Sequence, residues 1–118
     1  IEDELDVKFF IYIETEKRAY WPLPLLNQWL NYIESAKSAI KPLKRTDEEL
    51  YNVMIDRMNL ETMSLRYLKI QLYSDVAYNE VTLLEEKKAF RNDANRFNIT
   101  RYREGGFISN LCQSWGLS

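Results

Sequence analysis

The fold is decided by residues 46–97, which read TDEELYNVMIDRMNLETMSLRYLKIQLYSDVAYNEVTLLEEKKAFRNDANRF. No glycine or proline occurs in residues 43–104, so nothing there forces the backbone out of a helix. Apolar residues recur at steps of three and four, and a row with heptad spacing follows them. The first set is Met54, Met58, Leu65, Leu68, Leu72 and Val76, and the second is Val76, Leu83, Phe90 and Phe97. This pattern predicts a helical stripe that faces a core or a partner.

The length of this stretch leaves two arrangements open. One unbroken helix over 46–97 would be roughly 75 Å long, whereas a helix over 25–40 spans only about 24 Å and cannot cover it. A continuous helix would therefore need a second chain to cover its stripe. Ser74 and Asp75 favour a helix end, since short polar side chains bond to nearby backbone groups. We favour this fold-back, which predicts an antiparallel pair over 47–72 and 76–97.

Residues 7–21 also allow two interpretations. The run VKFFIYI at 7–13 is β-branched and aromatic, which is typical of a strand, and residues 18–21 could pair with it in a short β-hairpin. An isolated two-stranded hairpin is only marginally stable, and the chain offers no third strand. We therefore favour a helix of about four turns that ends before Pro22, with the hairpin at 7–21 as the alternative.

The remaining elements follow from helix start and stop signals. Pro24 suits the first turn of a helix over 25–40, and Lys41-Pro42 ends it. Thr46 and Glu49 have the spacing of a capping box, which predicts a helix start at Thr46. After the glycines at 105 and 106, residues 107–115 predict a short amphipathic helix. The fold class is therefore all-α, a single domain over 1–118: a small bundle of four or five helices built around a long helix or helical hairpin at 46–97.

Composition places limits on the class of protein. The chain has 118 residues, of which 46% are hydrophobic and 29% charged, with a net charge of −2, as in a small globular domain. Residues 19–33 are the longest run without charge, but two prolines and several polar residues make it unsuitable for crossing a membrane. The single cysteine, Cys112, allows no internal disulfide and favours a reducing compartment. We expect a cytoplasmic protein without membrane contact.

The residue types needed for most catalytic sites are missing. The sequence has no histidine, which excludes Ser-His-Asp and Cys-His triads and imidazole metal ligands. One cysteine cannot supply a structural zinc site, and no phosphate-binding glycine loop occurs. We expect no enzymatic activity, no catalytic residues, no cofactor and no metal. Cys112 falls on the apolar side of its short helix, which predicts a buried, unreactive thiol.

A basic stretch at residues 87–103 is the strongest local charge feature. Basic side chains interleaved with aromatic rings can bind phosphates and stack on bases. Phe90 and Phe97, however, belong to the heptad row and are explained better as core. The candidate contacts to phosphate or to an acidic partner are Lys87, Lys88, Arg91, Arg96, Arg101 and Arg103. Nucleic-acid binding through this stretch is the alternative hypothesis for function.

Aromatic residues point to a protein partner. The chain has eight tyrosines and three tryptophans, residue types that are enriched in protein interfaces. The candidate interface aromatics are Trp21, Trp29, Tyr102 and Trp115. The leading hypothesis is a non-enzymatic protein-binding module, an adaptor or inhibitor that occupies a partner's surface and can associate with itself into a homo-oligomer. Small accessory proteins of viruses and mobile elements often share this profile, which is an association only.

Overall fold

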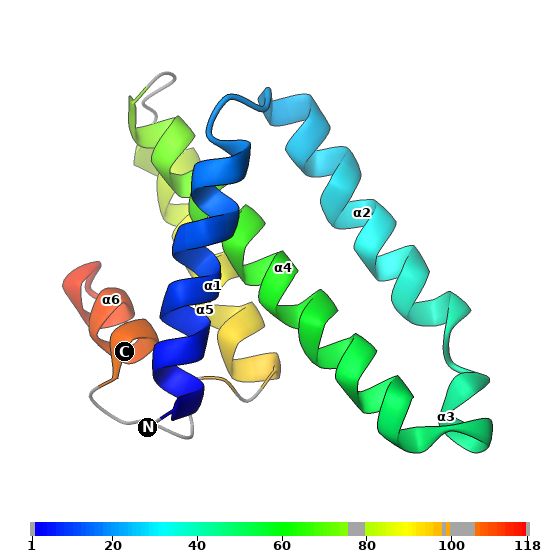
Figure 1. The fold of residues 1–118 in the computed structure, drawn as a ribbon. Helices are drawn as coiled ribbons and strands as arrows, with labels where there is room; N and C mark the ends of the chain where they lie inside the picture. Colours follow the sequence, from blue (N-terminus) through cyan, green and yellow to red (C-terminus); the bar gives the residue numbers. More distant parts are fainter. Residues whose placement is uncertain (1, 76–79, 98, 100–105, 118) are drawn as a thin grey trace.

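The computed structural model describes residues 2–75, 80–97, 99 and 106–117, and Figure 1 shows helices packed around one long central helix. The helices are α1 (Glu2–Arg18), α2 (Leu23–Ala39), α3 (Leu43–Thr46), α4 (Glu48–Asp75), α5 (Glu80–Arg96) and α6 (Phe107–Ser114). The described residues contain no strand, so the all-α class is confirmed. The expected count of four or five helices fits the longer elements, and α3 adds a single turn.

The alternative β-hairpin at 7–21 is wrong, because residues 2–18 form the continuous helix α1. Val7, Ile11 and Thr15 recur every four residues along it and are buried. A helix places these three side chains on one face, whereas a strand would have placed Val7, Phe9 and Ile11 together. The helical period therefore prevails over the β propensity of this run.

The long stretch folds back on itself. Helix α4 continues through Ser74 to Asp75, so the helix end expected after Leu72 lies further along the chain, and residues 76–79 are outside the described part. Helices α4 and α5 run antiparallel, which is visible in Figure 1 and in their paired residues. Tyr67 packs on Phe90 with ring centroids 6.1 Å apart, and Lys69 bonds to Glu86.

The start of α4 differs by one residue from the predicted capping box. Thr46 belongs to α3 and its hydroxyl donates to the Leu43 carbonyl. The cap is instead Asp47, whose carboxylate Oδ1 accepts from the Leu50 backbone N–H at 3.1 Å. Residues 43–46 form the turn α3, and the short carboxylate of Asp47 satisfies one of the free N–H groups of α4.

The core consists of two hydrophobic clusters that lie on opposite sides of α4. The first cluster joins α4 to α1, α5 and α6, and the second joins it to α2. The buried members of the first are Val7, Ile11, Met63, Ile70, Leu83, Phe90, Ala94, Ile108 and Cys112, and those of the second are Leu26, Leu30, Ile33, Leu65 and Leu68. Helix α4 is therefore covered on both sides in its C-terminal half, and Leu83 and Phe90 of the heptad row are core residues as expected.

Candidate functional site

The predicted basic stretch lies partly on α5, and its described cations all have partners within the chain. Lys87 lies over the Trp115 ring, with its Nζ 5.4 Å from the ring centroid. Lys88 is 3.9 Å from Glu85, and Arg91 donates to Asn92. Arg96 contacts Asp93 at 3.1 Å and Glu34 of α2 at 3.3 Å. Arg101, Tyr102 and Arg103 lie outside the described residues.

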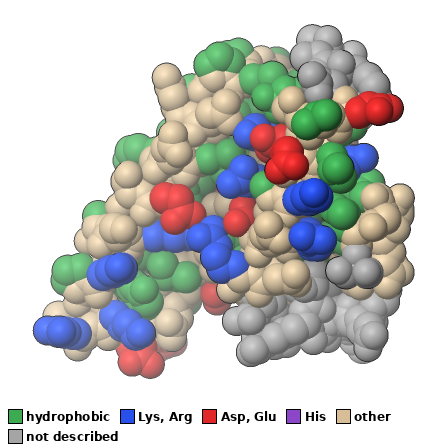
Figure 2. Space-filling model, turned by 180° about the vertical axis from the view of Figure 1, so that it is seen from behind, with side chains coloured by type: hydrophobic (Ala, Val, Ile, Leu, Met, Phe, Trp, Pro, Cys, Tyr) green, Lys and Arg blue, Asp and Glu red, His purple; other side chains and the backbone are tan. Residues whose placement is uncertain are grey.

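Acidic residues are interleaved with these cations. Lys69 and Arg66 of α4 pair with Glu86 and Asp93 of α5, at 3.0 Å for Lys69–Glu86 and 2.9 Å for Arg66–Asp93. Figure 2 shows the resulting mixture of blue and red side chains across the back of the molecule. Opposite charges at these distances offset one another, so the described residues of this face do not form a continuous basic track of the kind that follows a phosphate backbone.

The three tryptophans among the predicted interface aromatics lie in two separate places. Trp115 packs edge-on against the buried Phe90 ring at a centroid distance of 5.5 Å, which makes it a cover for the first cluster. Trp21, just before α2, packs against Trp29 of α2, with ring centroids 6.0 Å apart in an edge-to-face arrangement. The structure therefore separates Trp115 from the other two tryptophans and brings Trp21 and Trp29 into one group.

A carboxylate holds this tryptophan group in place. The indole Nε1 of Trp29 donates to Glu61 Oε1 of α4 at 2.8 Å. Arg18, at the end of α1, pairs with the same carboxylate and also lies over the Trp21 ring at 5.0 Å. Helices α1, α2 and α4 therefore meet at Glu61, and the Trp29 ring has a fixed position.

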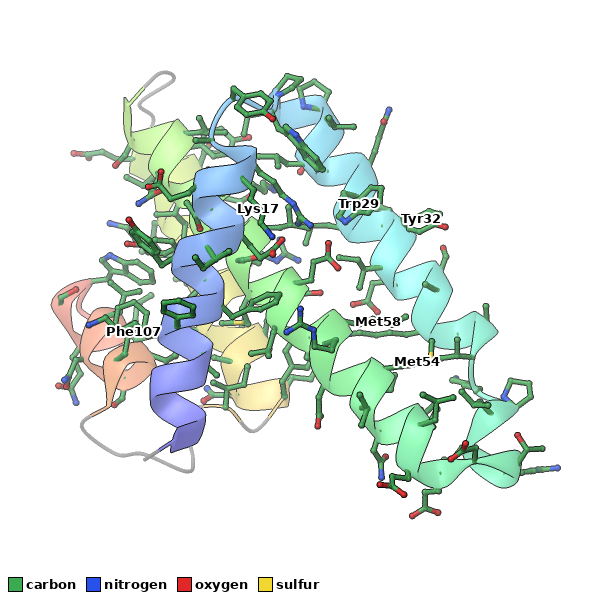
Figure 3. The ribbon with its side chains drawn as sticks, viewed as in Figure 1. Lys17, Trp29, Tyr32, Met54, Met58 and Phe107 are labelled. Carbon is green, nitrogen blue, oxygen red and sulfur yellow. The ribbon has the colours of Figure 1, made fainter. Side chains whose placement is uncertain are left out.

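Tyr32 extends this group into solvent. The Tyr32 ring stacks on Trp29 at a centroid distance of 5.2 Å, and Figure 3 shows the two side by side on α2. Tyr32 nevertheless remains 63% exposed, and Tyr20 just before α2 is 82% exposed. A ring that is both exposed and supported from behind loses little conformational freedom when a partner covers it.

The outward side of α2 carries no charge over most of its length. Residues 19–33 contain no Asp, Glu, Lys or Arg, and the exposed positions between Pro24 and Ile33 are Asn27, Gln28, Asn31 and Tyr32. They lie opposite the buried side of α2, which presents Leu26, Leu30 and Ile33 to the second cluster. We call Asn27, Gln28, Asn31 and Tyr32 the α2 face. In a chain with 29% charged residues, this exposed helix surface consists of amides and a tyrosine.

Two titratable groups have shifted pKa values. Burial raises the pKa of the Cys112 thiol, and the nearby charge of Arg91 offsets part of that effect. This agrees with the expectation of a buried thiol. Burial also lowers the pKa of Lys37, an effect that Arg96 reinforces and Glu34 opposes. Among the described residues, no group of three or more His, Cys, Asp or Glu side chains is placed to hold a metal ion.

Residue type alone did not identify Tyr32 and the amides of the α2 face as a surface. Their signal in the sequence is the charge-free run at 19–33. The role of Glu61 had no local signal, because its partner Trp29 lies 32 positions away.

No protein-family model matches this chain, and neither a curated protein nor a solved structure matches it. In the described part of the chain, every helix is too short or too polar to cross a membrane.

Proposed function

We propose that this chain is a non-enzymatic protein-binding module that acts by covering a partner's surface with the α2 face. The observation that carries the proposal is the charge-free, tyrosine- and amide-bearing exposed side of α2, fixed from behind by the bond between Trp29 and Glu61.

The chemistry of the α2 face suits protein recognition. Charged residues are depleted at the centres of protein interfaces, because burying an unpaired charge is costly. Tyrosine gives a large contact area with only two rotatable side-chain bonds, and asparagine offers both donors and acceptors to a partner's backbone. Tyr32 supplies the first type of contact, and Asn27, Gln28 and Asn31 supply the second.

A peptide selection tests this proposal without a known partner. Random peptides displayed on phage are selected on the wild-type chain, and binding of the selected peptides is measured on variants. We expect Asn31→Glu and Tyr32→Ala each to weaken binding at least about tenfold, since one buries a charge and the other removes an aromatic anchor.

Val81→Glu is the matched control, because Val81 is 72% exposed on α5, away from α2. Peptides should bind this variant as they bind the wild type. The proposal is wrong if the selected peptides bind Asn31→Glu and Tyr32→Ala as tightly as the wild type, or if no peptide is selected.

Nucleic-acid contact through residues 87–103 is our second proposal. The observation in its favour is that Arg96 and Lys88 keep 53% and 42% of their side chains exposed despite their acidic neighbours. Exposed ion pairs are weak, so a phosphate can compete for these cations. Acidic residues are interleaved with these cations and would repel phosphates, so we rank this proposal below protein binding through the α2 face.

A further inference from the structure

The three methionines of the chain all lie on α4, in two different environments. Met63 is 0% exposed and belongs to the first cluster. Met54 and Met58 lie one helical turn apart, and both are only partly buried. Figure 3 shows these two side chains extending from α4 toward α2. Two of the three thioether groups are therefore accessible to solvent on the side of α4 that faces α2, and the third is enclosed.

Met58 takes part in the contact that holds α2 on α4. It packs against the five buried residues of the second cluster, three of which come from α2 and two from α4. Toward α3 this contact becomes thin, because no residue from 34 to 57 is buried. Methionine is unbranched and flexible, so it fills irregular gaps between helices. Met54 and Met58 therefore place apolar atoms at the end of the α2–α4 contact where few others are available.

The sulfur atoms of these two residues can react with hydrogen peroxide. A lone pair of the sulfur attacks one peroxide oxygen, so that an S–O bond forms, the O–O bond breaks and water leaves. The sulfur loses two electrons and the peroxide gains them. The product is methionine sulfoxide, in which a flexible apolar side chain has become polar. Because the oxidant must reach the sulfur, Met54 and Met58 should react in the folded chain while Met63 is protected.

A sulfoxide at position 58 would weaken the α2–α4 contact. It places a polar oxygen against the apolar side chains of the second cluster, and a polar group without a hydrogen bond is costly to bury. Thr62, one turn further along α4, does not supply the missing donor, since its hydroxyl already donates to the Met58 carbonyl at 3.0 Å. The first cluster contains only Met63, so its packing should not change.

We propose that Met54 and Met58 form an oxidation site through which hydroperoxides weaken the attachment of α2 to α4. The modification is reversible, because methionine sulfoxide reductases return the sulfoxide to the thioether. In that step the reductase thiols are oxidised to a disulfide and the oxygen leaves as water. The inference does not depend on the proposed function, since the isolated chain shows both the reaction and its effect.

Peptide mass spectrometry tests the position of the site. The folded chain is treated with dilute hydrogen peroxide, digested and analysed for the addition of one oxygen atom to each methionine. We expect Met54 and Met58 to be oxidised at least about tenfold faster than Met63. In urea that unfolds the chain, all three should react at similar rates. If Met63 reacts as fast as the other two in the folded chain, the proposal is wrong.

Urea unfolding followed by circular dichroism tests the effect of oxidation. The ratio of folded to unfolded chain should fall at least about fivefold in the oxidised wild type, and treatment with the reductases should restore it. Met54→Leu combined with Met58→Leu conserves side-chain volume and removes both accessible sulfur atoms. Peroxide should leave the stability of this variant unchanged.

Met63→Leu is the matched control, because it keeps both accessible methionines. Peroxide should destabilise this variant as much as it destabilises the wild type. Two results would overturn the proposal. One is an oxidised wild type that is as stable as the untreated chain, and the other is a Met54→Leu, Met58→Leu variant that peroxide destabilises equally.

Discussion

Trp29 and Glu61 join α2 to α4 through a hydrogen bond of 2.8 Å from the indole Nε1 to the carboxylate Oε1. Both side chains are only partly exposed, and Arg18 of α1 uses the same carboxylate oxygen. A charged acceptor makes this bond stronger than one between neutral groups. The position of the α2 face relative to α1 and α4 therefore depends on this acidic side chain together with the second cluster.

Replacing that acid should lower stability measurably. In Glu61→Ala, the Trp29 N–H and the Arg18 guanidinium lose their shared acceptor, so we expect a loss of about 1–3 kcal/mol in the free energy of unfolding. Urea unfolding followed by tryptophan fluorescence measures this change. Glu16→Ala is the control, because Glu16 is exposed on α1, and it should cost less than about 0.5 kcal/mol. Equal costs for the two variants would show that the Glu61 contacts contribute nothing.

Truncation of the core should show that the two clusters are separate. Leu68→Ala and Met63→Ala should each cost about 2–5 kcal/mol, since both side chains are buried. The two residues face different clusters, so their effects should add to within about 0.5 kcal/mol. Leu68 and Leu30 belong to the same cluster, so the stability losses of Leu68→Ala and Leu30→Ala should not be additive. Denaturant unfolding of the single and double variants gives both comparisons, and strong coupling between Leu68 and Met63 would contradict the division.

Salt dependence tests the nucleic-acid proposal. If α5 binds phosphates, the affinity for mixed-sequence DNA, measured by fluorescence anisotropy, should fall steeply as salt rises, because counterions are released on binding. Arg91→Glu combined with Arg96→Glu should weaken binding to all sequences alike. Lys17→Glu, at an exposed position on α1, is the control and should bind as the wild type does. An absence of binding at low salt eliminates the proposal.

The shifted pKa of Cys112 predicts a loss of stability at alkaline pH. Burial raises its pKa in the folded state, so above the ordinary cysteine pKa of about 8.5 the unfolded chain loses the thiol proton first. The stabilisation is complete below that pH and is lost as the pH rises through the folded-state pKa. Between about pH 7.5 and about pH 9.5, the wild type should therefore lose more unfolding free energy than Cys112→Ala. Parallel losses in urea titrations of the two proteins would contradict this.

The sequence allowed prediction of the elements that depend on local spacing. The heptad positions Leu83 and Phe90 and the stop at Pro42 could be interpreted without a structure. The first helix was preferred only because the chain offers no third strand, and its buried face through Val7 and Ile11 became visible in the structure. The division of the core could not be predicted, because Met63 and Leu65 differ by two positions and one apolar stripe does not show that α4 is covered on both sides.

The candidate site was harder to predict than the fold. Trp21 and Trp29 were identified from their residue type, but residue type did not separate them from Trp115, which packs on Phe90. The partners of Arg96 also could not be predicted in full, because Glu34 lies 62 positions away from it. Contacts of this range depend on how α2 and α5 are placed by α4.

Helix α4 contributes residues to both clusters, so the two clusters can open separately. If α2 separates from α4, the second cluster opens. Phe90, Ile108 and the other residues of the first cluster stay packed on the other side of α4. Partial openings of this kind cost less free energy than global unfolding. Backbone amides of α2 should therefore exchange with deuterated solvent sooner than those in the C-terminal half of α4. The surface proposed for recognition would then lie on α2, the helix that can separate from α4 and pack again while the first cluster stays folded.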